Sequence, residues 1–207
     1  MKRLKFLLLI LTSLLFTVTH NYGQSASIDK FDIKKFDSEK IYNKQSQVLE
    51  VNDTLKDGTT IKQFEDGDYY IEKIQLLNSP IIQTKAYFKD TGNLEIISKT
   101  FYSFPIGSTN EYNRNGKLIK QTKWDKNFSF SIDDLSAKLK KEFDIDIMHT
   151  NQALYVSVVR GFENGSYYSV SIGKLCKCEH RFIRIDGNSG KVLSNKIQPY
   201  PDDSGSQ

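Results

Sequence analysis

Residues 88–94, FKDTGNL, align with residues 112–118, YNRNGKL, at an offset of 24 residues. In each stretch an aromatic residue opens a polar turn, and a glycine and one further polar residue then lead into a leucine. Glycine supplies the positive φ angle that a tight hairpin requires. Because repetition at a fixed offset indicates stacked hairpins, we predict an antiparallel sheet around these two turns.

The same pattern of strand and turn extends on both sides of the repeat. The dipeptides Asp57-Gly58 and Asp66-Gly67 are typical of hairpin turns. Apolar residues alternate with polar ones over residues 59–64, 69–77, 81–88, 94–104 and 117–124. Short strands separated by such turns predict an antiparallel β meander over residues 47–126.

The second turn resembles the MORN-variant repeats of the YwqK-like antitoxin family. Those repeats have the form aromatic-Tyr-x-x-x-Gly-x-Leu followed by a strand, and residues 110–119 fit this form from Tyr112 onward. Glu111 stands where the family has an aromatic residue, and the copy at Phe88 is degenerate. The resemblance covers about residues 82–126. It implies a ladder of β-hairpins used for contact, and it carries no catalytic residue over to this chain.

The pattern changes at Phe128, where helical signals begin. Ser131 and Asp134 have the spacing of a capping box, which predicts a helix over about residues 131–143. Its apolar residues recur at helical spacing along one face, namely Ile132, Leu135, Leu139 and Phe143. Further strands are predicted over residues 154–160, 167–175, 182–186 and 191–196.

One helix followed by antiparallel strands resembles the PepSY domain family. The match is best over residues 182–193, FIRIDGNSGKVL, which are similar to that family's closing hairpin, hydrophobic-x-hydrophobic-Asp-x-x-x-Gly-Lys-Val. PepSY-like domains are exported and non-enzymatic and often inhibit peptidases, so the resemblance implies such a role. We therefore predict an α+β fold: an N-terminal antiparallel β meander, then a PepSY-like unit of one helix and an antiparallel sheet over residues 127–200.

The first residues have the pattern of a cleaved signal peptide. Lys2, Arg3 and Lys5 precede an apolar run that is too short to span a bilayer comfortably, and polar residues follow it. We predict a signal peptide over residues 1–23 and export to the periplasm or the outside of a bacterial cell. Residues 24–46 are predicted as a mobile lead-in that contributes at most one edge strand, and residues 201–207 as a disordered tail.

The charge balance gives no support to nucleic-acid binding. The chain holds 29 basic and 25 acidic residues, and three of the basic residues lie in the predicted signal peptide. The exported chain therefore has 26 basic against 25 acidic residues, so its net charge is close to zero.

Cys176, Cys178 and His180 stand two residues apart, so on a continuous strand their side chains would share one face. Such a set could begin a zinc or copper site, and an envelope metal-binding or redox module is one alternative function. The simpler interpretation is a turn at a strand edge that holds two thiols and a solvated histidine. We favour this interpretation and expect neither a metal nor a cofactor.

An unrecognised hydrolase is the second alternative. His149 and His180 are the histidines available to such a site in the exported chain, and no nucleophile elbow or zinc-protease motif occurs. Asp144 and Asp146 are better explained as a solvated helix exit than as a catalytic pair. Residues 187–191, GNSGK, are predicted as a hairpin turn because the phosphate-loop spacing is missing.

Adjacent aromatic pairs along the strands indicate a surface for protein contact, because one member of each pair faces outward. The residues chosen as partner-binding candidates are Tyr70, Tyr87, Tyr102, Tyr112 and Tyr168. Trp124 is predicted to lie in the core at the junction of the two halves. The leading prediction is an exported, non-enzymatic protein that neutralises a protein partner, as an immunity protein against a delivered toxin or as a peptidase inhibitor.

Overall fold

The computed structural model describes residues 29–149, 154–174 and 179–199, and the predicted signal peptide and tail lie outside these ranges. A short helix, α2 (Ile33–Glu39), precedes the first sheet and a longer one, α3 (Ile132–Phe143), precedes the second. The strands of the first sheet are β1 (Ile41–Asn43), β2 (Val48–Thr54), β3 (Thr60–Asp66), β4 (Tyr69–Gln75), β5 (Ile81–Phe88), β6 (Leu94–Phe101), β7 (Phe104–Tyr112) and β8 (Leu118–Lys123). Those of the second sheet are β9 (Leu154–Phe162), β10 (Ser166–Lys174), β11 (Glu179–Asp186) and β12 (Val192–Pro199).

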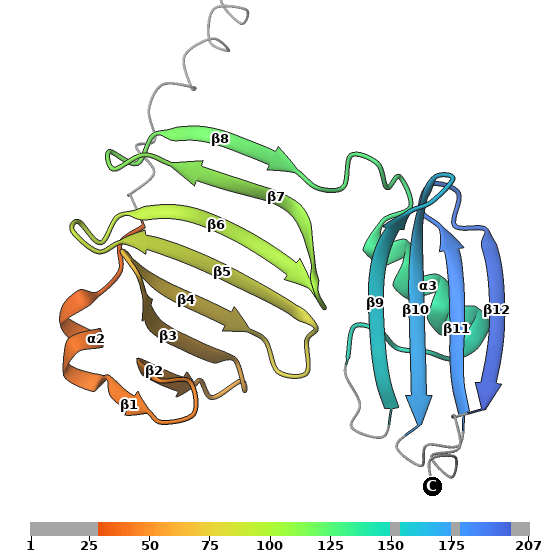
Figure 1. The fold of residues 1–207 in the computed structure, drawn as a ribbon, viewed down its shortest axis with the longest axis horizontal. Coiled ribbons are helices and arrows are strands. Elements are labelled where there is room, and N and C mark those ends of the chain that lie inside the picture. The colour runs from red at the N-terminus through yellow and green to blue at the C-terminus, as the bar shows by residue number, and fades with distance from the viewer. Residues whose placement is uncertain (1–28, 150–153, 175–178, 200–207) are drawn as a thin grey trace, which may run out of the picture.

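The first sheet is an antiparallel meander in which strands β1 to β8 lie in chain order (Figure 1). Residues 88–94 and 112–118 form two successive turns in it, and their glycines have the predicted positive φ of 68° and 74°. The two turns contact each other, because Arg114 Nε lies 3.0 Å from Asp90 Oδ2 and its guanidinium lies 4.6 Å from the centre of the Phe88 ring. The predicted hairpins are confirmed.

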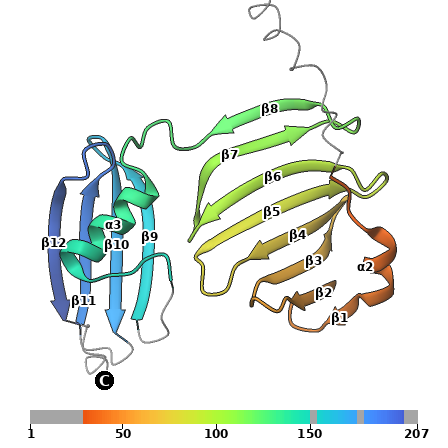
Figure 2. The ribbon, with the colours of Figure 1, turned by 180° about the vertical axis from the view of Figure 1, so that it is seen from behind.

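The second sheet has the order β12-β11-β10-β9, and α3 lies across one of its faces (Figure 2). The helix begins as predicted, since Ser131 Oγ accepts the Asp134 N–H at 3.1 Å and Asp134 Oδ2 accepts the Ser131 N–H at 3.1 Å. Leu135 and Leu139 are fully buried against the sheet. The predicted turn at residues 187–191 joins β11 to β12.

The predicted α+β class, with a PepSY-like second unit, is wrong. Strands make up 55% of the described residues and helices 12%, so this part of the protein is nearly all β. The two helices of the described residues have seven and twelve residues, and neither forms a layer over the eight-stranded sheet. The capped helix was correctly predicted, but it is one of two short helices beside twelve strands in the described residues.

The segment from Asp29 to Ser46 packs against the first sheet, where a mobile lead-in was predicted, and its β1 is the edge strand that was expected of it. Phe36 of α2 is fully buried, and the Phe31 ring stacks on Tyr70 with 4.5 Å between ring centres. The Phe31 N–H donates to the carbonyl of Gly92 at 2.9 Å, which holds the segment against the β5–β6 turn. Helix α2 was not predicted because it is shorter than two full turns and buries only one of its side chains.

Two buried clusters stabilise the fold. The smaller one lies between α2 and the first sheet and contains Phe31, Phe36, Tyr70, Tyr87 and Leu94. The larger one lies between α3 and the second sheet, and it also includes residues of β6 and β7. Trp124 belongs to neither cluster and is 41% exposed, so its predicted core position is wrong. Within the described ranges, each helix is too short or too polar to cross a lipid bilayer.

Candidate binding cleft between the two sheets

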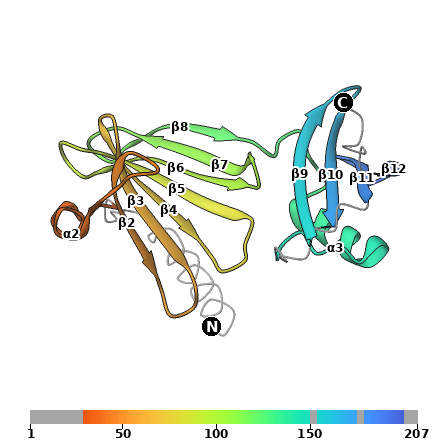
Figure 3. The same cartoon turned by 60° about the horizontal axis from the view of Figure 1, so that its bottom comes forward.

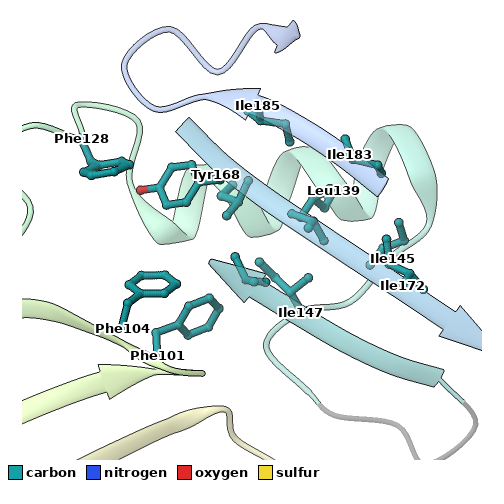
Figure 4. Close-up of a cluster of buried hydrophobic side chains, with 13 residues drawn as sticks. Phe101, Phe104, Phe128, Leu139, Ile145, Ile147, Tyr168, Ile172, Ile183 and Ile185 are labelled. Atoms are coloured by element: carbon teal, nitrogen blue, oxygen red, sulfur yellow. The ribbon is translucent and has the colours of Figure 1, made fainter. Parts of the chain in front are cut away.

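The two sheets meet at the tight turn between β6 and β7, which points toward the edge of β9 (Figure 3). Phe101 and Phe104 project from this turn into the larger core (Figure 4). Tyr102 between them has a φ of +52°, a conformation that bulky residues rarely adopt. Its hydroxyl donates to the Ile147 carbonyl at 3.1 Å, and burial raises the pKa of Tyr102 to about 12. We call residues 101–104 the joint.

Arg160 of β9 fastens the joint to the second sheet. Its side chain is 8% exposed, and its guanidinium carbon lies 4.8 Å and 4.2 Å from the ring centres of Phe104 and Phe128. One Arg160 amine lies 2.7 Å from Asp125 Oδ1, and Asp125 Oδ2 accepts the Gly107 N–H at 2.7 Å. A desolvated guanidinium between aromatic rings is stabilised by cation–π attraction. The contacts therefore set the spacing of the two sheets.

An open cleft of about 650 Å³ lies beside the joint. The first sheet contributes Ile81, Ile97 and Ile106 to its wall, and the second unit contributes Phe128 and Ile132 at the start of α3. Since the two walls come from different sheets, neither sheet forms the cleft alone. Its volume falls in the range of sites that hold a small ligand or a few residues of a peptide.

Several polar side chains of the cleft have no hydrogen bond or ion pair with a described residue. The side chains of Gln83, Ser98 and Ser108 form no hydrogen bond with any described residue. Lys99 from the first sheet and Asp133 from α3 also line the cleft, and neither forms an ion pair within the described ranges. The cleft therefore combines apolar walls, free hydrogen-bonding groups and one charge of each sign.

A second candidate surface is the face of β9–β12 turned away from α3, which we call the outer face. Side chains of alternate residues point there, because Val158, Val170 and Ile183 are buried on the other side. The outer face carries Tyr155, Ser157, Val159, Tyr167, Ser169, Ser171 and Phe182. Tyr155 is 61% exposed, and no described residue packs over this face (Figure 1).

The predicted partner-binding tyrosines are mostly structural. Tyr70 and Tyr87 are buried in the smaller core and Tyr168 in the larger one, so none of the three can touch a partner. Tyr102 belongs to the joint, and Tyr112 is half-buried against the smaller core. Alternation correctly indicated that each aromatic pair splits between two faces, but it does not tell which face is covered.

The two histidine candidates for metal or hydrolytic chemistry lie outside the cleft. Cys176 and Cys178 lie outside the described residues. His180 lies on β11, and His149 is exposed with its Nδ1 3.2 Å from Asp146 Oδ2; neither histidine lines the cleft. Within the described ranges no three metal-ligating side chains come together.

None of the described candidate site residues predicted from the sequence lines the cleft. Its walls are isoleucines on ordinary alternating strands, and nothing local distinguishes Ile97 from other strand residues. The single available signal is the Phe-Tyr-Ser-Phe sequence of the joint, which places three aromatic residues within one turn. Comparisons of the chain with protein-family models, curated proteins and solved structures found no match.

Proposed function

We propose that the chain is an exported binding protein that holds and neutralises a protein partner, such as a toxin or a peptidase, without chemistry of its own. The observation that carries this proposal is the uncovered outer face. Tyr155 and Val159 are 61% and 42% exposed on a sheet whose opposite face holds the larger core. Exposed apolar groups gathered on one face are typical of interaction sites.

The composition of the outer face supports contact with protein. Aromatic side chains surround a centre of serines, in which Ser171 pairs with Ser157 on one side and with Phe182 on the other. Small residues leave the face flat enough for close approach, and aromatic residues supply large contact areas at little cost in conformational entropy. The guanidinium of Arg184 lies 4.1 Å from the centre of the Tyr167 ring and adds a cation at the rim.

Site-specific photo-crosslinking in the cell that makes the protein tests the proposal. A benzoylphenylalanine at position 155 should yield a discrete adduct, whereas one at Lys141, on the exposed side of α3, should yield none. Val159→Glu should abolish the adduct and leave the circular dichroism spectrum unchanged, because a carboxylate would be buried without a partner. The purified protein should also begin near Gln24. No adduct, or equal adducts at both positions, would contradict the proposal.

A further inference from the structure

The cleft beside the joint is a composite site that exists only while the two sheets hold their spacing. Its apolar walls approach from opposite sides, with Ile97 and Ile106 on one side and Ile132 on the other. Arg160 and the joint maintain this spacing through the buried contacts of the guanidinium with the Phe104 and Phe128 rings and through its ion pair with Asp125. The site is therefore preorganised, which lowers the entropic cost of binding.

The free polar groups of the cleft match a polypeptide backbone. Gln83 offers both a donor and an acceptor, and Ser108 offers a hydroxyl that can do either. These two side chains come from β5 and β7, on either side of β6, so they are spaced across the wall rather than clustered at one point. Groups spread in this way suit a ligand whose own donors and acceptors repeat, as those of an extended peptide do.

The two charged side chains on opposite walls of the cleft would orient a bound ligand. The Lys99 ammonium lies on the first sheet and the Asp133 carboxylate on α3, and neither is neutralised by a described residue. The other two charged residues, Arg160 and Asp125, neutralise each other. A ligand that fits would place an acidic group toward Lys99 and a basic group toward Asp133, and this requirement supplies specificity.

From these observations we infer that the cleft holds an extended segment of the partner polypeptide. An apolar side chain of the segment enters between Ile97 and Ile132, and an acidic residue pairs with Lys99. This inference rests on the proposed function and adds to it the second, sequence-selective contact that the outer face by itself does not provide.

Selection of peptides on the purified exported chain tests the inference. A phage-displayed library of random heptapeptides should yield peptides with an apolar residue flanked by an acidic one. Lys99→Glu should lower the affinity for such a peptide at least tenfold in a fluorescence-polarisation titration. Replacing the acidic residue of the peptide by lysine should restore its binding to that variant. Lys123→Glu makes the same charge change on β8 outside the cleft and should leave the affinity unchanged.

Two results would overturn the inference: a library that yields no binding peptide, or selected peptides that bind Lys99→Glu as tightly as the natural chain. A cleft-filling Ser108→Trp variant, checked by circular dichroism, should also lose the peptide. The two proposals fail separately. An adduct at position 155 without peptide binding would leave the proposed function intact and overturn the inference about the cleft. Peptide binding without an adduct would contradict the proposed function, while the cleft would still be shown to hold a peptide.

Discussion

At the scale of single residues, Glu50 shows how the first sheet keeps a buried charge. Its carboxylate is 2% exposed and accepts hydrogen bonds from the side-chain amides of Asn43 and Asn52 at 2.6 and 2.7 Å. Lys62 Nζ lies 2.7 Å away. The Asn43 hydrogen bond is the largest contribution, and together these contacts lower the pKa of Glu50 to about 2. The carboxylate thereby holds the β1–β2 turn against β3.

Glu50→Gln should destabilise the protein by about 2 kcal/mol at pH 7, because it leaves donors of the site without an acceptor. The folded pKa lies below the ordinary value of 4.5, so the contribution of Glu50 is complete above about pH 4.5 and is lost as the pH falls toward 2. Urea unfolding should therefore show a large difference in the free energy of unfolding between the variant and the natural chain at pH 7, and a small difference at pH 2.5.

Glu163→Gln is the matched control for this prediction. Its carboxylate is 65% exposed and lies 3.3 Å from Arg184, and an exposed pair of this kind contributes little to stability. If the difference in the free energy of unfolding between Glu50→Gln and the natural chain is the same at pH 7 and pH 2.5, the carboxylate is not the source of the stability.

At the scale of elements, α3 combines two roles. Its apolar stripe closes the larger core, and its first turn forms one wall of the cleft. The capping box at Ser131 fixes where the helix starts and therefore where Ile132 and Asp133 stand relative to the first sheet. An error of one residue in the start of the helix would rotate both side chains out of the cleft.

Ser131→Ala removes the acceptor for the Asp134 N–H and should destabilise the protein by about 1 kcal/mol. Thermal unfolding measures the effect. Ser131→Asp should retain most of the stability because aspartate caps helices about as well as serine. Equal melting temperatures for the alanine variant and the natural chain would mean that the cap has no stabilising role here.

At the scale of the whole molecule, the joint couples two sheets that otherwise have separate cores. Phe101 and Phe104 belong to the first sheet by strand pairing and to the second by burial. The αL conformation of Tyr102 costs backbone energy. Its hydroxyl bond to Ile147 and the two buried rings offset that cost. The buried contacts of the joint therefore hold the two sheets in one arrangement, which a flexible linker would not do.

Phe104→Ala should destabilise the protein by about 3 kcal/mol and separate the unfolding of the two sheets, since it opens a cavity in the larger core, to which both sheets contribute. Differential scanning calorimetry should show two transitions in place of one. Phe64→Ala removes the same side chain from β3, where it belongs to neither buried cluster, and should keep a single transition. A single transition in both variants would show that the joint does not couple the sheets.

The sequence by itself determined the hairpins of the meander, the start and end of α3 and the turn between β11 and β12. Each depends on a glycine, a capping residue or an alternation that acts within a few residues of the chain. Such local signals persist whatever else the chain contacts, and for this reason they were predicted correctly.

Only the tertiary structure decided which faces are covered. Tyr70 and Tyr168 became core residues because α2 and α3 pack over their side of the sheets, and Trp124 remained exposed because neither cluster includes it. The cleft arises from strands and a helix that lie far apart in the sequence. Whether a side chain is buried depends on which distant part of the chain packs against it. The spacing of residues within one strand does not contain that information.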